Sequence, residues 1–117
     1  MSEFVFLYRG NDRDDVSARR AAPEEMQKNM QKWMAWLKQL AEKGHVKDNG
    51  QPLDLGGRTV RAKKSITDGP FAEKDVVMGY SIIRAKDLDE AARLADGCPI
   101  LERGGAVEVR QVLTNNM

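Results

Sequence analysis

The stretch Asp75-Val76-Val77-Met78-Gly79-Tyr80-Ser81-Ile82-Ile83 decides the fold, because it is the part of the chain most typical of a β-strand. Side chains along a strand alternate between its two faces. One face is predicted to carry Val76, Met78, Tyr80 and Ile82, and the other Val77, Gly79, Ser81 and Ile83. Both sets are largely apolar, so we expect both faces of this strand to be buried.

Further strands are predicted on either side of this stretch. Phe4-Val5-Phe6-Leu7-Tyr8 is an apolar run that ends in a turn, and it too is apolar on both faces. Residues 58–62 form a second strand with residues 65–67 as a short returning partner, and residues 106–113 alternate cleanly. The segment 45–57, which is rich in Gly, Asn, Asp and Pro, is predicted to be a loop.

A long helix is predicted from Pro23 to Gly44, because proline suits the first helical position and glycine a helix end. The preceding segment, 10–22, is predicted to be a solvated loop, with a mobile lid as the alternative. One stripe of the helix carries Met26, Met30, Trp33, Met34, Leu37, Leu40 and Ala41. This stripe can be a core face or the wall of a ligand pocket, and we favour the core. Trp36, at its edge, can reach into a cleft or an interface.

A second helix is predicted between Asp87, whose spacing to Glu90 suits a capping box, and Gly97. The order is then strand, helix, strand, strand, helix, strand, which predicts an α+β fold of the ferredoxin-like βαββαβ type. Both helices of such a fold pack on one face of the sheet, yet two strands here are apolar on both faces. We therefore expect a homodimer, in which a second subunit covers the other face.

Composition excludes several classes of protein. The 117 residues fit a single domain, residues 1–117, and 41% hydrophobic with 32% charged residues is typical of a globular chain. A net charge of +1 without a block of like charges argues against nucleic acid and membrane partners. One Cys and one His cannot form a disulfide or a structural zinc site, so no metal is expected. With no apolar run of membrane length, a cytoplasmic protein is predicted.

The most distinctive local sequence is Thr67-Asp68-Gly69-Pro70-Phe71-Ala72-Glu73, which predicts a rigid turn between two strands. Together with Gly79-Tyr80, Asp89-Glu90-Ala91, Cys98-Pro99 and Glu108-Val109-Arg110, it resembles the YCII-related domain family, and more narrowly the subgroup with the Asp-Gly-Pro-Phe motif. The resemblance runs from Phe4 to Val112. It implies a ferredoxin-like chain that pairs through its sheet into a dimeric α+β barrel.

The resemblance implies less about activity. A His–Asp pair is proposed as catalytic in some members of the family, and a few are thought to act on lactones as lyases or dehalogenases. The single histidine, His45, follows the helix-ending Gly44, whereas the family's histidine falls earlier, near the first helix. The pair is therefore not carried over to this chain. Members that resemble it also occur beside or fused to alternative RNA polymerase sigma factors.

The candidate site residues are polar side chains that the strand pattern brings toward one cleft. Asp68 and His45 are the candidate catalytic residues, and Arg9 (or Tyr8), Tyr80, Glu108 and Arg110 are the candidate substrate-binding residues. An arginine in a cleft suits a carboxylate because its fork binds two oxygens.

Each candidate also has a structural interpretation. Asp68 can cap its own turn, Glu108 and Arg110 can pair across a dimer interface, and Tyr80 can be a core ring. His45 can face water at the end of the helix, or act as a general base oriented by Asp48. Cys98 is expected to be a buried, inert thiol. Gly56-Gly57 and Gly104-Gly105 lack the spacing of a nucleotide-binding loop.

Two functions are open from the sequence. The first is an enzyme or binder that acts, without metal or organic cofactor, on a small anionic metabolite such as a lactone or carboxylate. The second is a non-catalytic accessory domain linked to sigma-factor-type regulation. The missing family histidine favours the second somewhat, and an intact polar pocket would favour the first.

Overall fold

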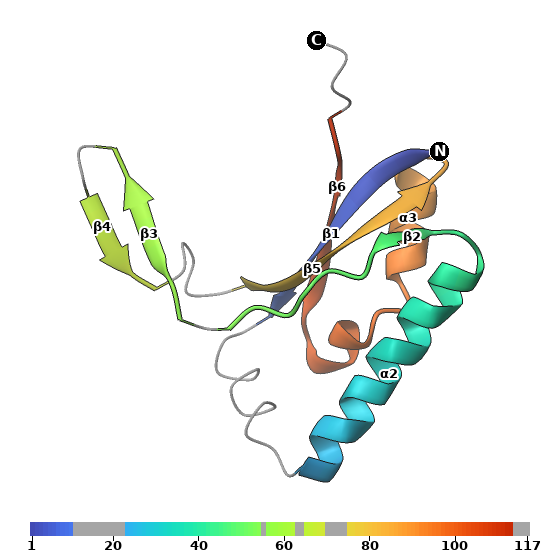
Figure 1. Ribbon diagram of the computed structural model, residues 1–117, viewed down its shortest axis with the longest axis horizontal. Helices are drawn as coiled ribbons and strands as arrows, with labels where there is room; N and C mark the ends of the chain where they lie inside the picture. The colour runs from blue at the N-terminus through green and yellow to red at the C-terminus, as the bar shows by residue number, and fades with distance from the viewer. Residues whose placement is uncertain (11–22, 55, 63–64, 70–74, 114–117) are drawn as a thin grey trace.

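The computed structural model describes residues 1–10, 23–54, 56–62, 65–69 and 75–113. Its centre is a four-stranded antiparallel sheet in the order β2-β5-β1-β6, with a separate two-stranded hairpin of β3 and β4 (Figure 1). The strands are β1 Ser2–Gly10, β2 Val46–Asp48, β3 Arg58–Arg61, β4 Ser65–Asp68, β5 Val76–Ala85 and β6 Ala106–Gln111. The helices are α2 Pro23–Glu42, α3 Leu88–Ala95 and the 3-10 helix η1 Pro99–Arg103. The fold is a mixed α+β fold, as predicted.

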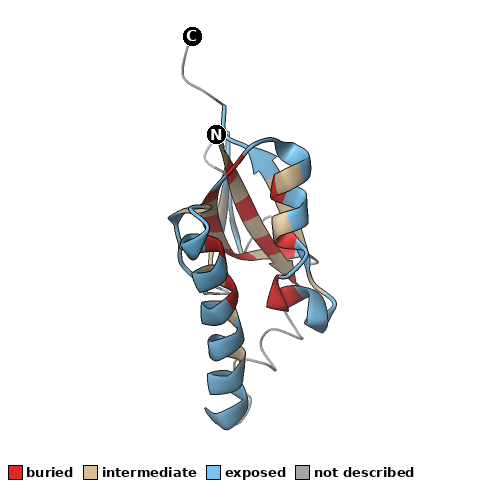
Figure 2. Cartoon of the chain, turned by 90° about the vertical axis from the view of Figure 1, so that its right-hand side faces the viewer, coloured by how far each residue is buried: buried red, intermediate tan, exposed pale blue. Residues whose placement is uncertain are grey.

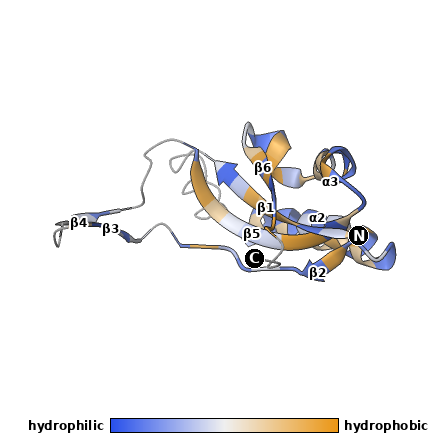
Figure 3. Ribbon diagram, turned by 90° about the horizontal axis from the view of Figure 1, so that it is seen from above, coloured by the Kyte–Doolittle hydropathy of each residue, from blue (hydrophilic) through white to orange (hydrophobic). Residues whose placement is uncertain are grey.

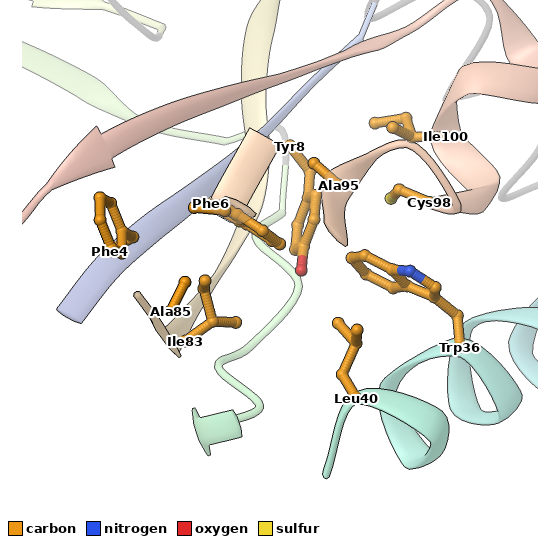
Figure 4. Packing of buried hydrophobic residues seen from close by; sticks show 11 residues of the cluster. Phe4, Phe6, Tyr8, Trp36, Leu40, Ile83, Ala85, Ala95, Cys98 and Ile100 are labelled. Atoms are coloured by element: carbon orange, nitrogen blue, oxygen red, sulfur yellow. The ribbon is translucent and has the colours of Figure 1, made fainter. Parts of the chain in front are cut away.

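The core lies between the sheet and its two α-helices. Every second residue of β1 from Phe4 to Gly10 is buried, as strand alternation requires. Figure 4 shows Phe6 and Tyr8 of β1 pointing toward Trp36 and Leu40 of α2. Small residues of α3, Ala91 and Ala95, complete the same cluster, so both helices cover one face of the sheet.

The predicted assignment of β5 residues to two faces is wrong for the residues that precede Gly79. The pairing of β1 with β5 shifts after Tyr8, which lies opposite Gly79, so that Arg9 lies opposite Val77. The shift leaves one extra residue, Met78, on β5. A β-bulge of this kind reverses the alternation beyond it. Val76 therefore belongs to the helix-covered face and does not share a face with Tyr80.

Both predicted helices are confirmed. α2 begins at Pro23 and ends shortly before Gly44, whose φ of 78° is the left-handed conformation that favours glycine. At α3 the Asp87 carboxylate accepts a bond from the Glu90 N–H at 2.9 Å. The Glu90 carboxylate in turn accepts from the Lys86 N–H at 2.9 Å, one residue earlier than in a standard capping box.

Trp36 is a core residue and does not reach into a cleft or an interface. Its side chain is buried and stacks on Phe6 with ring centroids 6.1 Å apart. Its indole N–H donates to the Leu94 carbonyl at 3.3 Å, which ties α2 to α3. A buried indole needs such an acceptor. The packing around Gly97 is close, because a Cβ there would lie 3.1 Å from the Trp36 ring.

The second strand of the sheet is not the one predicted. Residues 58–61 do pair with residues 65–68, as expected, but this hairpin is separate from the four-stranded sheet. The place beside β5 is taken by β2, which lies in the segment predicted to be a loop. A three-residue strand with one apolar side chain, Val46, has no alternation from which it could be recognised.

The β3–β4 hairpin stands away from the rest of the fold (Figures 1 and 3). Its cross-strand pair Val60 and Ile66 is 68% and 62% exposed. A two-stranded hairpin of this kind gains little stability from its own contacts. Of the motif predicted to form a rigid turn, Thr67 and Asp68 belong to β4 and Gly69 has a φ of 86°, and residues 70–73 lie outside the described residues.

Two other expectations concern the segment 10–22 and membrane-spanning helices. Segment 10–22 was predicted to be a loop, with a mobile lid as the alternative, and all of it except Gly10 lies outside the described residues. In the part of the chain that the structure describes, no helix combines the length and apolarity needed to cross a membrane.

Candidate functional site

A cavity of about 420 Å³ lies between residues 26–37 of α2, the middle of β5, residues 49–52 and η1. This volume is in the usual range of small-molecule sites. The wall is mainly apolar and is made by Met26, Met30, Trp33, Met34, Leu37, Met78 and Ile100. The polar residues that border it are Tyr8, Asn29, Asn49, Gln51, Tyr80, Ser81 and Arg103.

The methionines of α2 line this cavity and are not core residues. Met26, Met30 and Met34 recur every four residues, which places them on one stripe of the helix. Their side chains are 38%, 60% and 66% exposed. The preference for a core face was therefore wrong for this half of the stripe, and the pocket interpretation is the one that the structure supports. Methionine suits such a wall because its flexible, polarisable chain adapts to ligands of different shape.

The residues that follow β2 lie directly against β5 and form the floor of the cavity. The Leu53 N–H donates to the Met78 carbonyl at 2.8 Å, and Pro52 forms a bridge with Gly79. Gly50, at φ 75°, allows this approach, because a Cβ there would lie 1.6 Å from the Tyr80 carbonyl oxygen. Residues 49–52 are thus held as a rigid border of the cavity.

Three residues of the cavity wall form a chain of hydrogen bonds. The Tyr8 hydroxyl donates to the Ser81 hydroxyl at 2.6 Å, and Ser81 donates to the Asn49 backbone carbonyl at 2.6 Å. Ser81 is fully buried and Tyr8 is 5% exposed. Burial raises the pKa of the Tyr8 phenol well above its ordinary value, against a smaller lowering by Ser81. Tyr8 therefore stays protonated and donates.

Arg103 supplies charge to the border. Among the described residues that line the cavity it is the one charged side chain, and none of them is Asp, Glu, His or Cys. Beside it, Lys32 of α2 and Glu102 of η1 form an ion pair at 3.0 Å. Both partners are more than half exposed, so the pair contributes little stability, but it links the two elements that border the cavity.

Of the predicted substrate-binding residues, Tyr80 and the alternative Tyr8 border the cavity. Tyr8 belongs to the helix-covered face, with its ring edge-on to Trp33 at 4.6 Å between centroids. Tyr80 lies opposite Leu7 in the register, so its side chain belongs to the other face of the sheet. The Tyr80 carbonyl lies beside Gly50, which is another residue of the cavity border.

Arg9, Glu108 and Arg110 lie together, away from the cavity. Arg9 Nε is 2.7 Å from Glu108 Oε1, and Arg110 lies 3.5 Å from the other Glu108 oxygen. A second Arg9 nitrogen donates to the Asp75 carbonyl at 2.7 Å, where the backbone enters β5 at a φ of 53°. Arg9 is the main cause that lowers the pKa of Glu108. Glu108 and Arg110 pair within one chain here.

The two predicted catalytic residues are not brought together. Asp68 lies on β4, where its carboxylate pairs with Arg58 at 3.1 Å and its side chain is 91% exposed. His45 follows α2, and its Nδ1 lies 2.8 Å from the Arg84 carbonyl. The carboxylate of Asp48 accepts from the Gly50 N–H at 2.7 Å, so Asp48 does not orient His45. Neither Asp68 nor His45 borders the cavity.

Cys98 is buried, as predicted. Burial raises the pKa of its thiol to about 12, against a smaller lowering by a bond from the Ile100 backbone. The thiol is therefore a poor nucleophile. In the described part of the chain, no group of three or more His, Cys, Asp or Glu residues could hold a metal ion.

Sequence analysis missed several residues of the cavity border. Asn49, Gln51 and Arg103 lie in segments without periodicity, where the spacing of residues gives no direction for a side chain. Ser81 was assigned to a face but not to a role. Its position between apolar residues, in the middle of the strongest strand, was the one available indication, because a buried hydroxyl needs a hydrogen-bond partner.

Comparison with known proteins gives a family and a distant structure. The family model described as the YCII-related domain matches residues 4–116. No curated protein matches the chain. Among solved structures, the chain is similar to 5-chloro-2-hydroxyhydroquinone dehydrochlorinase from Burkholderia phenoliruptrix, in complex with 2,5-dihydroxybenzoquinone. The identity is 19%, the match covers 97% of this chain and 95% of the other, and the TM-score is 0.44.

Proposed function

The chain belongs to the YCII-related domain family, and from this premise we propose that it binds a small molecule in the cavity between α2, residues 49–52 and β5. The observation that carries the proposal is the cavity itself. A volume of about 420 Å³ with an apolar wall and a few polar groups is typical of ligand sites. Exposed methionines at helical spacing are costly in water unless something apolar covers them.

The ligand class follows from the residues on the border. The wall fits an apolar body, and Arg103 fits an anionic group, because its fork pairs with both oxygens of a carboxylate. This agrees with the expected lactone or carboxylate, with Arg103 in the substrate-binding role that was predicted for Arg9 and Arg110.

We propose binding in preference to catalysis by acid–base or nucleophilic chemistry. Such chemistry ordinarily uses His, Asp, Glu, Cys or Lys, and the described residues on the border include none of them. The Tyr8 phenol and the Ser81 hydroxyl are committed to each other and to Asn49. A serine without an adjacent base is a weak nucleophile.

A thermal-shift screen against small aromatic and aliphatic carboxylates and lactones tests the proposal, since binding to the native state raises its stability. The screen is run on the unaltered chain, on Arg103→Ala, and on Arg93→Ala as the matched control on α3. We expect hits whose affinity falls about tenfold in Arg103→Ala and stays unchanged in Arg93→Ala.

Two other outcomes of that screen would refute the proposal. Hits that are lost in Arg110→Ala but kept in Arg103→Ala would move the site to the Arg9–Glu108–Arg110 cluster. A screen without any hit would favour the accessory-domain alternative instead.

We also propose the finer classification and assembly. The sheet order β2-β5-β1-β6 suits a ferredoxin-like fold in which the β3–β4 hairpin is an insertion, and Asp68-Gly69-Pro70-Phe71 suits the subgroup with that motif. The face opposite the helices carries Val5, Leu7 and Ile82, which suits a homodimer joined through the sheets. Sedimentation equilibrium tests it: a stable monomer of 13.1 kDa would refute the dimer.

A further inference from the structure

The direction of the hydrogen-bond chain in the cavity wall is determined by its last member. The Asn49 backbone carbonyl can only accept, so Ser81 must donate to it. A hydroxyl has one hydrogen, so Ser81 can only accept from Tyr8. Tyr8 must then use its own hydrogen on Ser81. What the Tyr8 oxygen has left is its capacity to accept.

That capacity is not used within the described part of the protein. None of the hydrogen bonds among the described residues donates to the Tyr8 oxygen. Tyr8 borders the cavity together with its two partners, and its ring lies edge-on to Trp33. The raised pKa of Tyr8 keeps the hydrogen in place and so keeps the direction of the chain.

We propose that the cavity selects ligands that present a hydrogen-bond donor, a hydroxyl or an N–H group, to the Tyr8 oxygen. This inference rests on the proposed function of the cavity and specifies its ligand further. A ligand that offers only an acceptor at this point, such as an ether or a carboxylate oxygen, sets one lone pair against another and loses its hydrogen bonds to water without replacement. The carboxylate end, where there is one, lies at Arg103, and the donor end at Tyr8.

The test uses two neutral probes that differ in one donor, 2-naphthol and 2-methoxynaphthalene. Titration calorimetry gives the dissociation constant of each with the unaltered chain and with Tyr8→Phe. We expect the naphthol to bind about tenfold more tightly than its methyl ether, although the ether is the more apolar probe. In Tyr8→Phe, where the acceptor is gone, the two probes are expected to bind within about twofold of each other.

A second variant keeps the test decisive if Tyr8→Phe folds poorly. In Ser81→Ala the Tyr8 hydrogen is released from its acceptor and becomes available to a ligand. The preference for the naphthol is then expected to fall by about fivefold or more, because Tyr8 can donate to the ether oxygen.

The possible failures are distinguishable. Equal binding of both probes to the unaltered chain would overturn the donor preference and leave small-molecule binding intact. A preference that disappears in Tyr80→Phe but persists in Tyr8→Phe would also overturn it. If neither probe binds and the carboxylate screen also gives no hit, the proposed function fails and the donor preference fails with it.

Discussion

The two halves of α2 have the same amphipathic pattern and different roles. In the C-terminal half, Trp36 and Leu40 are buried against the sheet. Figure 2 shows α2 exposed along most of its length, with its buried residues away from its N-terminal end. In the N-terminal half, Met26 and Met30 are 38% and 60% exposed and line a cavity. The difference lies in what the helix faces, since the first half borders the cavity and the second contacts the aromatic side chains of β1.

An apolar stripe on a helix therefore indicates that an apolar partner covers it, but it does not identify that partner. The C-terminal half finds that partner within the chain through Trp36 and Leu40, which are less flexible than methionine. The N-terminal half carries flexible methionines, which suit a partner of variable shape. The stability of the protein should therefore reside in one half, and ligand binding in the other.

The largest expected effect is on stability in the core half. Trp36→Ala removes a buried ring that stacks on Phe6 and bonds to Leu94, and should lower the free energy of unfolding by about 3–5 kcal/mol. Urea denaturation followed by circular dichroism measures it. A loss below about 1 kcal/mol would contradict the division of α2 into two halves.

The thiol of Cys98 reports on the same core. Its pKa of about 12 and its burial predict that a disulfide reagent at pH 8 reacts with the native chain about a thousandfold more slowly than with the chain in urea. The rate is followed by absorbance. Equal rates in both conditions would show that the core around η1 opens freely.

The cavity half should respond in the opposite way to the core. Met30→Ala is expected to change the free energy of unfolding by less than about 1 kcal/mol, because the side chain is 60% exposed. It should weaken the binding of 2-naphthol about threefold to tenfold through lost apolar contact. Denaturation and calorimetry on the same sample give both numbers. Strong destabilisation without an effect on binding would make Met30 a core residue.

The smallest expected effect lies on the opposite face of the sheet. Arg9 lowers the pKa of Glu108, so the carboxylate favours the folded state at pH values above its ordinary pKa of 4.5. That contribution disappears as the pH falls through the lowered pKa. Glu108→Gln should lower Tm slightly at pH 7, and the difference should vanish in acid. A difference that is constant with pH would show that this pair contributes nothing to stability through its charge.

How much of the fold can be predicted from the sequence depends on the number of residues in each helix or strand. β1, β5, β6 and both helices have enough residues for their period to be recognised, and the capping role of Asp87 follows from its spacing to Glu90. β2 has three residues and was missed. The bulge at Met78 was also missed, because strand alternation assumes a regular partner and the irregularity belongs to the pair of strands.

The candidate site was harder to predict. Tyr8 and Tyr80 were named and do border the cavity, but Asp68, His45, Arg9, Glu108 and Arg110 lie elsewhere. Strand alternation assigns a charged residue to one face of the sheet, but its neighbours on that face are unknown until the register is known. Arg103 is the last residue of the 3-10 helix η1, whose position depends on the packing of Ile100. Tertiary contacts, and not local pattern, bring these residues to the cavity or keep them from it.

The methionines themselves offer the most direct test of the central claim. Met26, Met30, Met34 and Met78 border the cavity, whereas Met1 is exposed and precedes β1. A titration of methyl-labelled methionine with 2-naphthol, followed by NMR, reports on each methyl group separately. The account predicts saturable shifts of the four cavity methyls and none at Met1. Shifts that spare Met30 and Met34, or that affect Met1 equally, would contradict it.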